Sequence, residues 1–382
     1  MIDAECDRGV AGLAEHDWDA VVIGAGPAGS LTAGLLAERG RSVLLVEKSV
    51  FPRWKVCGAC LGAAGVGVLE RHGLMDDVRQ QGARPVEMAD LCWRGRRARV
   101  ALRGMVTISR NAMDAALADR ARERGAAVAF GVRADASPGG RVRLSGRDGG
   151  CEVRARVVVQ AGGLRAARGA GSGVRTGAWM GLGAVSDAGD DHSGGSLMMA
   201  VGARGYVGRV VTEGGVANWA AAVDPALVRE MGSPAEAAAS ICARAGVEER
   251  PPCDGWFGTP TLTRRAPAVD GAVCRVGDAA GYVEPITGEG MSWALLGAEA
   301  LAPIVDRSLA SGHRPIAWIR VHGRLMRRRR WRCGAVARAL RSPITMGSAM
   351  VLFGGLEAGR AGERLASGLV GGLIGAGNGR RA

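Results

Sequence analysis

One short stretch constrains the fold more than any other, because residues 19–47 carry the pattern of a strand, a glycine-rich turn, a helix and a second strand. An apolar run, Ala20 to Ile23, leads straight into Gly24-Ala25-Gly26-Pro27-Ala28-Gly29, and a helical apolar stripe follows. A second apolar run, Val43 to Val46, ends at Glu47. This order predicts one βαβ unit and therefore a parallel sheet with helices on its faces.

The three glycines of the turn have separate physical roles. Gly24 permits the tight turn, Gly26 has no Cβ to hold a pyrophosphate away from the backbone, and Gly29 lets the helix approach the sheet. Unpaired N–H groups and the helix dipole favour phosphates at the helix N-terminus. Glu47 is placed to accept hydrogen bonds from a ribose diol. Glycine is abundant, at 62 of 382 residues, so the glycine spacing alone could arise by chance and is weak evidence for a dinucleotide site. The strand, helix, second strand and acidic residue in this order make the prediction of dinucleotide binding strong.

The bulk composition permits a large core and leaves the charge open to two interpretations. With 47% hydrophobic residues, the chain should form one or two domains. The net charge of +13 would attract polyanions. Lys48 and Lys55 are the only lysines, however, so the excess is almost entirely arginine. We expect a solvated basic surface and no nucleic-acid partner.

The cysteines, the histidines and the N-terminus bear on cofactors and location. Nine scattered cysteines and five histidines without ligand spacing predict reduced thiols and no metal site. Residues 1–18 hold five acidic side chains and no apolar core after a basic head, so we expect no signal peptide. No stretch reaches the roughly 18 to 20 apolar residues that span a bilayer. We expect a cytoplasmic protein, with peripheral contact at the inner membrane face as an open alternative.

A second strand, loop and helix N-terminus occurs at residues 272–291. An apolar strand, Ala272 to Val276, leads to a loop with Asp278 where a phosphate-cradling glycine would be needed, so this is not a second dinucleotide fingerprint. A carboxylate there suits hydroxyl groups such as those of a ribityl chain, and the amides of Gly288 to Gly290 can face an electron-rich ring. The alternative is a simple turn capped by the aspartate.

Between these two motifs, sheet-rich blocks alternate with pieces of the nucleotide domain. Short alternating runs predict antiparallel strands over 85–108 and again over 173–265, interrupted by a helix from Pro234 to Ala245. A helix is predicted from Arg110 to Arg124, then a hairpin from Val142 to Val153 and a buried strand from Val157 to Val159. The interleaving predicts two layers built from non-contiguous segments.

Three motifs in order resemble the FAD-dependent geranylgeranyl reductase family. They are the turn Gly24 to Gly29 with Glu47, the segment Pro52-Arg53-Trp54-Lys55-Val56-Cys57-Gly58, and the run from Gly277-Asp278 through Gly288-Glu289-Gly290-Met291. That family lies within the 4-hydroxybenzoate hydroxylase-like superfamily of flavoproteins, and the resemblance covers about residues 19–312. It implies FAD as cofactor and NAD(P)H as a transient reductant. The implied cofactor-binding residues are Gly24, Gly26, Ala28, Gly29, Glu47, Lys48, Cys57, Gly58, Arg110, Ala134, Asp278, Gly290 and Met291.

The fold class that follows is α/β, with a GR2-type Rossmann FAD-binding domain, an interleaved mixed β-sheet substrate domain and a helical C-terminal tail. The FAD-binding domain is expected over 19–84, 109–172 and 268–312. The substrate domain is expected over 85–108 and 173–267, and the helical C-terminal region over 313–382.

The reaction is less closely specified than the cofactor. Isoprenoid reductases of this type carry a Tyr-x-Trp-x-Phe-Pro pattern where this chain has Tyr206-Val207-Gly208-Arg209-Val210, and the halogenase pattern is absent as well. We therefore expect a monooxygenase that hydroxylates a lipophilic or phenolic small molecule, with isoprenoid double-bond reduction as the alternative. A non-enzymatic polyanion-binding protein is a remote third. No catalytic residue and no oligomeric state can be named.

Two further features leave alternatives open. Cys57 and Cys60 could form a redox disulfide, but the chain lacks the second Rossmann unit that would bind a nicotinamide in such an enzyme. We therefore expect Cys57 to pack against the flavin.

The C-terminal region joins an arginine run, 327–332, to two apolar stretches, 343–356 and 365–377. These could be interfacial helices that meet lipid phosphates or a helical cap on the substrate domain. The arginine run lacks interleaved aromatic residues beyond Trp331 and any known nucleic-acid-binding module.

Overall fold

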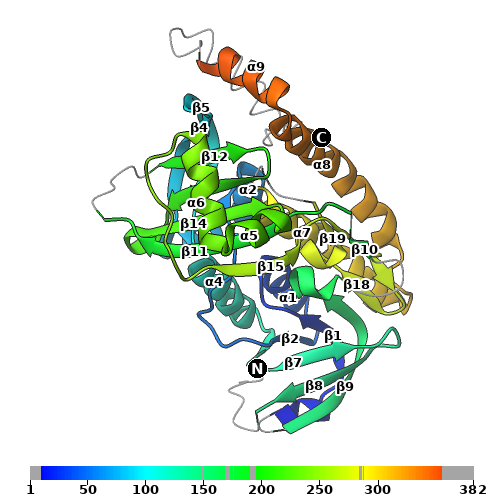
Figure 1. Ribbon diagram of the computed structural model, residues 1–382. Helices are drawn as coiled ribbons and strands as arrows, with labels where there is room; N and C mark the ends of the chain where they lie inside the picture. The colour runs from blue at the N-terminus through cyan, green and yellow to red at the C-terminus, as the bar shows by residue number, and fades with distance from the viewer. Residues whose placement is uncertain are drawn as a thin grey trace.

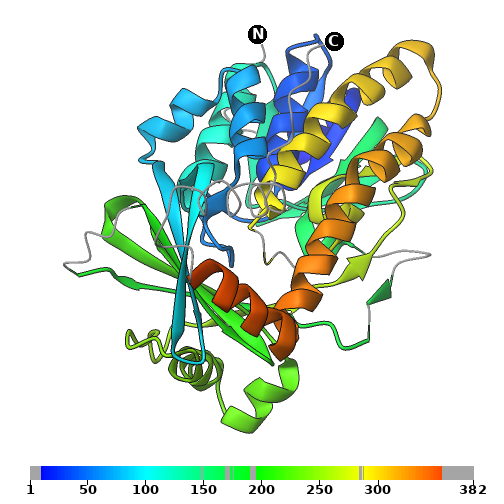
Figure 2. The same ribbon diagram turned by 90° about the horizontal axis from the view of Figure 1, so that it is seen from above.

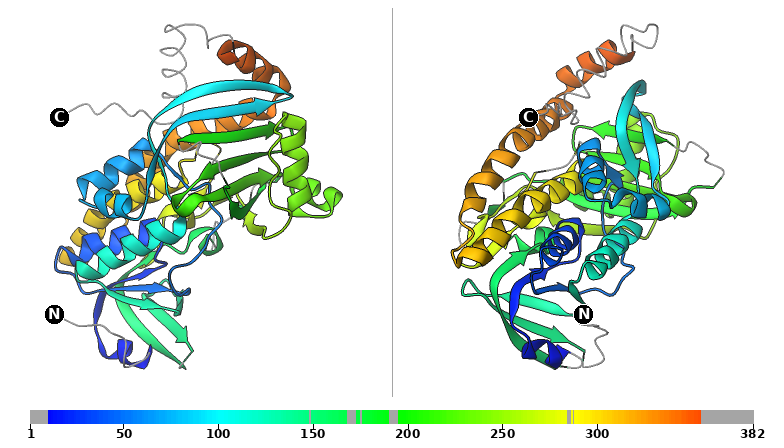
Figure 3. Two further views of the ribbon diagram at one scale, coloured as in Figure 1. Left: turned by 90° about the vertical axis from the view of Figure 1, so that its left-hand side faces the viewer. Right: turned by 180° about the vertical axis from the view of Figure 1, so that it is seen from behind.

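The computed structural model describes residues 10–354 apart from 148, 168–172, 175, 190–194, 284, 285 and 287. Two large sheets lie on either side of a layer of helices, as Figure 1 and the left view of Figure 3 show. The N-terminal βαβ unit belongs to the lower sheet of Figure 1, and the last two described helices run along the upper side of the molecule. The site is formed between these layers.

The first sheet has the strand order β17-β18-β9-β1-β2-β6. Its strands are β1 (Trp18–Ile23), β2 (Val43–Glu47), β6 (Ala127–Phe130), β9 (Gly149–Gln160), β17 (Val269–Asp270) and β18 (Val273–Arg275). β1 pairs in parallel with both β2 and β9, which confirms the predicted βαβ unit and parallel sheet. One face is covered by α1 (Pro27–Ala37), α4 (Arg110–Glu123) and α7 (Gly290–Ser311). The other is covered by a short 3-10 helix (Val10–Glu15), β7 (Arg133–Ala136) and β8 (Arg141–Gly146).

β9 differs from the expectation in its length. The sequence pattern predicts a hairpin ending at Val153 and a separate strand from Val157 to Val159, but one strand of 12 residues runs through both. Its first half pairs antiparallel with β8, and its side chains alternate between buried and exposed. Its second half pairs in parallel with β1 and is mostly buried on both faces. The sequence changes from alternating to continuously apolar because β9 changes its pairing partner from β8 to β1, and the strand does not end there.

The second sheet has the strand order β15-β11-β14-β13-β12-β4-β5-β3. Its strands are β3 (Cys60–Leu61), β4 (Arg84–Trp93), β5 (Arg96–Thr107), β11 (Met180–Asp187), β12 (Ser196–Gly202), β13 (Gly205–Val211), β14 (Val216–Val223) and β15 (Phe257–Thr261). The parallel pairing of β4 with β12 joins strands from the segments 85–108 and 173–267 in one sheet. A small third sheet joins β10 (Gly173–Val174), β16 (Arg264–Arg265) and β19 (Gly281–Tyr282).

Two helices, α5 (Pro225–Met231) and α6 (Pro234–Ala245), pack on the second sheet. The bounds of α6 are as predicted, because the Ser233 side chain accepts a hydrogen bond from the Glu236 N–H and Gly246 ends the helix in the left-handed region. α5 was not predicted from the sequence. Its signal is Asp224 before a proline, a short capping pattern at the start of only seven residues.

The remaining helices are α2 (Ala63–Arg71) and α3 (Met75–Gln80) after the first βαβ unit, and α8 (Ala317–Arg341) and α9 (Pro343–Gly354) at the end. α8 is anchored where the Trp318 indole N–H donates to the carbonyl oxygen of Arg275 at 2.8 Å. Figure 2 shows α8 and α9, in orange and red, at the front of the molecule, where α9 packs against β5. Among the described helices, none combines the length and the hydropathy needed to cross a bilayer. The apolar stretch 365–377 lies outside the described residues.

Candidate functional site

One cavity of about 1090 Å³ connects the two glycine-rich loops to the second sheet. The loop after β1 and the loop after β18 both line it, so Gly26 and Asp278 lie on the same side of the molecule. Most of the residues predicted to bind the cofactor line this cavity. They are Gly24, Gly26, Ala28, Glu47, Lys48, Cys57, Gly58, Arg110, Asp278, Gly290 and Met291.

Two predicted residues lie outside the lining. Gly29 is buried in α1, where an added Cβ would lie 1.8 Å from the Gly24 carbonyl oxygen, so its role is to let the helix and the turn pack together. Ala134 lies on β7 and packs against the apolar cluster on the other face of the first sheet. The proximity of Ala134 to a dinucleotide therefore stays a prediction.

The first loop holds Glu47 in a fixed position. Gly24 has a φ of +101°, and its N–H donates to the Val46 carbonyl oxygen at 2.7 Å, which closes the turn over the end of β2. The Glu47 carboxylate accepts hydrogen bonds from the Ala25 N–H at 3.1 Å and the Ser49 N–H at 3.0 Å. A carboxylate fixed in this way at the carboxyl end of β2 is suited to accept hydrogen bonds from a ribose diol.

The space over Gly26 fits a phosphate group. An ideal Cβ on Gly26 would lie 3.2 Å from Nη2 of Arg110, so any side chain at this position would crowd the guanidinium group. Asp114 accepts two hydrogen bonds from Arg110, at 2.8 and 2.6 Å, and forms an ion pair with Arg53 at 3.0 Å. A pyrophosphate at this loop would meet the N–H groups of the α1 N-terminus and these positive charges. The residues present therefore fit the pyrophosphate of a dinucleotide.

Asp278 and Lys55 interact electrostatically inside the cavity. Asp278 lies on a 3-10 turn (Gly277–Ala280); burial raises the pKa of its carboxyl, and the positive charges of Lys55 and Arg110 offset this only in part. Burial lowers the pKa of Lys55 to about 8, and the charge of Arg110 adds to the decrease while Asp278 opposes it. Lys55 was not among the predicted site residues. Its signal was its place in the 52–58 motif and the scarcity of lysine in the chain.

The N-terminus of α7 also faces the cavity. Gly290 and Met291 are its first residues, and both line the cavity. The side chain of Glu289, at the N-cap position, makes no capping hydrogen bond to the N–H groups of the first turn. The N–H groups of this first turn can therefore bind an electron-rich ring edge. An added Cβ on Gly290 would lie 3.6 Å from the Tyr282 hydroxyl oxygen, so the helix start and this tyrosine are in contact. Glu284, Pro285 and Thr287 of the predicted motif lie outside the described residues.

Beyond the cofactor loops, the cavity forms a chamber with a floor of small residues. Gly208 of β13 pairs with Ala220 of β14, and Gly181 of β11 pairs with Ala222, so these four positions form one patch on the second sheet. An added Cβ on Gly208 would lie 3.0 Å from the Met199 sulfur. The Met199 side chain beside Gly208 and the Thr259 side chain beside Gly181 therefore border this patch of small residues.

The roof of the chamber comes from the C-terminal helices. Val336 and Leu340 of α8 and Met346 and Met350 of α9 line it, and both methionines are buried. Apolar side chains thus surround the chamber on the side opposite the sheet. The prediction of a helical cap is consistent with this arrangement for the described part of the region.

Two tyrosines supply hydroxyl groups to the chamber. Tyr206 of β13 is 7% exposed, and both it and Tyr282 line the cavity. Burial raises the pKa of Tyr282 well above its usual value, and the negative charge of Asp278 adds to the increase. Tyr282 is therefore a hydrogen-bond donor throughout the physiological pH range. From the sequence alone, either tyrosine could contact the substrate, although a packed strand or loop residue is the simpler interpretation of each.

Cys57 and Cys60 have different surroundings. Cys57 lines the cavity, and its carbonyl oxygen accepts a hydrogen bond of 2.9 Å from the Asn218 amide. Cys60 is 5% exposed, and burial, with a smaller effect of Cys57, raises the pKa of its thiol to about 12. Both are free thiols. A thiol with so high a pKa is a poor attacking thiolate, which argues against a redox disulfide.

Comparison with known proteins identifies the cofactor domain. Residues 17–189 match the model of a family described as FAD binding domain. The digeranylgeranylglycerophospholipid reductase of Methanosarcina acetivorans is 32% identical over 179 residues, which are 42% of this chain and 41% of the relative. The menaquinone reductase of Mycobacterium tuberculosis is 44% identical over 70 residues, 17% of each chain. The chain thus spans less than half the length of these curated relatives.

Solved structures resemble almost the whole chain. A flavoprotein/dehydrogenase from Cytophaga hutchinsonii has 19% identity and a TM-score of 0.72, with 92% of each chain covered. PqsL from Pseudomonas aeruginosa, described as "a probable FAD-dependent monooxygenase", has 20% identity and a TM-score of 0.66, with 87% of this chain and 99% of that chain covered. At this level of identity the likeness shows the fold alone. The chain therefore has the same fold as these two solved structures.

Proposed function

Because residues 17–189 match an FAD binding domain, we propose that this protein is an FAD-dependent oxidoreductase whose substrate is a lipophilic small molecule. The observation that carries the proposal is the single cavity that joins the dinucleotide loops to an apolar chamber. Bound FAD supplies hydride and oxygen chemistry. The residues of the chain bind and orient the cofactor, and the apolar walls exclude water from the substrate.

The reaction we propose is hydroxylation of a substrate with a flat ring. One oxygen atom of O₂ is inserted into a C–H bond, the other is reduced to water with the uptake of one proton, and NAD(P)H is oxidised to NAD(P)⁺. Two features favour a ring: the floor of glycine and alanine, and Gly208 at the position where isoprenoid reductases carry a tryptophan. The Tyr282 hydroxyl is available to donate a hydrogen bond to a polar group on that ring.

Reduction of an isoprenoid double bond is the second candidate. It is favoured by the sequence match to the digeranylgeranylglycerophospholipid reductase, which is 32% identical over 179 residues. The apolar roof of α8 and α9 would also suit a polyprenyl chain. In this reaction a hydride and a proton add across the double bond, and O₂ takes no part.

Product analysis with and without air separates the two candidates. The FAD-loaded protein is incubated with NADPH and either a long-chain alkylphenol or a geranylgeranyl lipid, under labelled dioxygen or under argon. Hydroxylation predicts a product that gains one labelled oxygen atom and forms only in air. A product that gains two hydrogen atoms under argon would support the reductase instead. A flavin that neither NADH nor NADPH reduces would contradict both.

A further inference from the structure

The outer face of α8 carries a basic stripe with an exposed tryptophan. Arg320, Arg324, Arg327 and Trp331 follow one another at intervals of three or four residues, which places them on one side of the helix. All four are exposed, Trp331 at 71%, whereas Trp318 on the opposite side is fully buried. The sequences of α8 and α9 contain no aspartate or glutamate. Among the described residues, none of the three arginines has an acidic partner.

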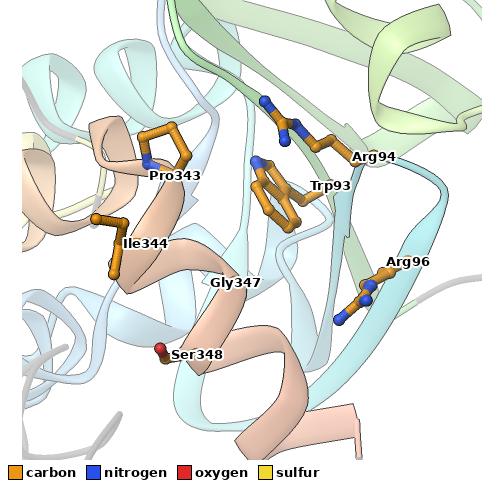
Figure 4. Close-up of a pocket in the computed structure, with 7 residues that line it drawn as sticks. All are labelled: Trp93, Arg94, Arg96, Pro343, Ile344, Gly347 and Ser348. Atoms are coloured by element: carbon orange, nitrogen blue, oxygen red, sulfur yellow. The ribbon is translucent and has the colours of Figure 1, made fainter.

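A groove of about 840 Å³ lies next to the end of α8, between α9 and the tip of the β4–β5 hairpin (Figure 4). It is lined by Trp93, Arg94, Arg96, Pro343, Ile344, Gly347 and Ser348. The Arg94 guanidinium carbon lies 5.0 Å from the Trp93 ring centroid, and Ile344 is 82% exposed. Guanidinium groups beside apolar side chains match the region of a lipid where the anionic headgroup meets the acyl chain.

The same helices separate the substrate chamber from this outer surface. The inner faces of α8 and α9 line the chamber through Leu340 and Met346, while Trp331 and Ile344 point outward. A surface bound to these helices would therefore lie over the roof of an apolar chamber. A bilayer placed there would supply lipophilic molecules at the nearest side of the protein.

We propose that α8 and α9 dock this protein on an anionic lipid surface, with the basic stripe at the headgroups and Trp331 and Ile344 in the interface. Charge complementarity and exposed apolar side chains on one helical pair favour this partner. A nucleic acid would satisfy the arginines but would leave two exposed isoleucines without an apolar partner: Ile344 at the start of α9, and Ile316, which is 65% exposed, at the N-terminal end of α8. The docking does not depend on the proposed reaction.

Vesicle flotation with the full chain loaded with FAD tests the proposal without any turnover. We expect binding to vesicles of phosphatidylcholine with phosphatidylglycerol, weak binding to phosphatidylcholine alone, and loss of binding at high salt. The triple variant R320Q/R324Q/R327Q should bind on the order of 100-fold less well, at about 1 kcal/mol for each arginine. Brominated lipid should quench the tryptophan fluorescence of the wild type more than that of Trp331→Phe, because the variant lacks the tryptophan that is proposed to lie in the interface.

The matched control removes three exposed arginines from the opposite end of the molecule, as R133Q/R143Q/R154Q. This variant has the same net charge as the test variant and should keep vesicle binding. Retained flavin absorbance shows that each variant is folded. Equal loss of binding in the two triple variants would overturn the proposal, since it would reflect net charge alone. Binding to DNA with no binding to anionic vesicles would also overturn it.

Discussion

The charge of Lys55 depends on the cavity around it. In the cofactor-free protein its pKa is lowered to about 8, so the ammonium group is charged below that pH and neutral above it. If the ammonium group interacts with the phosphates of FAD, cofactor binding favours the protonated form. The affinity for FAD is then constant below about pH 8 and falls as the pH rises, by up to about tenfold per pH unit.

This pH dependence can be assigned to one side chain. We expect Lys55→Met to bind FAD more weakly at pH 7 and to lose most of the decrease above pH 8, as measured by quenching of flavin fluorescence on titration. Lys48→Met removes the only other lysine and should keep the pH dependence of the wild type. The same pH profile in Lys55→Met and the wild type would rule out this role for Lys55.

Cys60 is expected to be structural. Its thiol is buried and stays protonated because its pKa is raised to about 12, so it cannot act as an attacking thiolate at neutral pH. Cys60→Ser should therefore retain NADPH oxidation and product formation within about threefold, with a stability loss on the order of 1 kcal/mol for the buried hydroxyl. Steady-state kinetics and thermal unfolding measure the two effects. Abolished turnover in a folded, FAD-loaded variant would restore the redox-disulfide interpretation.

At the scale of the elements, the floor of the chamber depends on the pairing of β11, β13 and β14. Gly208→Trp would place a large ring above Ala220 and against the flexible Met199 side chain, so the chamber becomes smaller while the cofactor loops stay unchanged. We expect unchanged affinity for FAD and at least tenfold weaker binding of an apolar probe such as phenylnaphthylamine. Fluorescence titrations measure both affinities.

Gly139→Trp is the matched control for this element, because Gly139 lies in the β7–β8 turn and an added Cβ there meets only the Ser137 hydroxyl, at 3.9 Å. It should bind the probe as the wild type does. Unchanged probe binding in Gly208→Trp would mean that the floor of β13 is not part of the substrate site.

The sequence predicted the elements whose signals are local. The βαβ unit follows from Gly24, Gly26 and Gly29 with Glu47, and α6 follows from its serine cap and terminal glycine, because these patterns lie within a few turns of chain. The length of β9 could not be predicted, since its two halves change partners and so change apolar pattern.

The floor of the chamber and the lowered pKa of Lys55 could not be predicted from local sequence patterns. Gly181 and Ala222 meet only through the register of two strands, and neither residue carries a chemical group that marks it as functional. The lowered pKa of Lys55 depends on burial and on Arg110, which is 55 residues away in the sequence. Long-range packing therefore decides the parts of the site that sequence reasoning missed.

At the scale of the whole molecule, distant segments of the chain build a single cavity. The 24–29 turn, the 53–58 segment and the 277–291 loop supply its cofactor end, and the second sheet with α8 and α9 supplies its apolar end. A ligand that spans these segments binds only the folded chain, so FAD should raise the unfolding temperature of the cofactor-free protein. The chain segments that form the two ends of this cavity therefore alternate along the sequence.

The visible absorption spectrum of the purified protein, before and after addition of excess FAD, tests the central claim most directly. The account predicts a yellow protein with the bands of bound oxidised flavin, which NADH or NADPH bleaches. It also predicts that Asp278→Ala retains little flavin after gel filtration, because the loop opposite Gly26 loses its carboxylate. A folded wild-type protein that stays colourless after incubation with excess FAD would contradict the account.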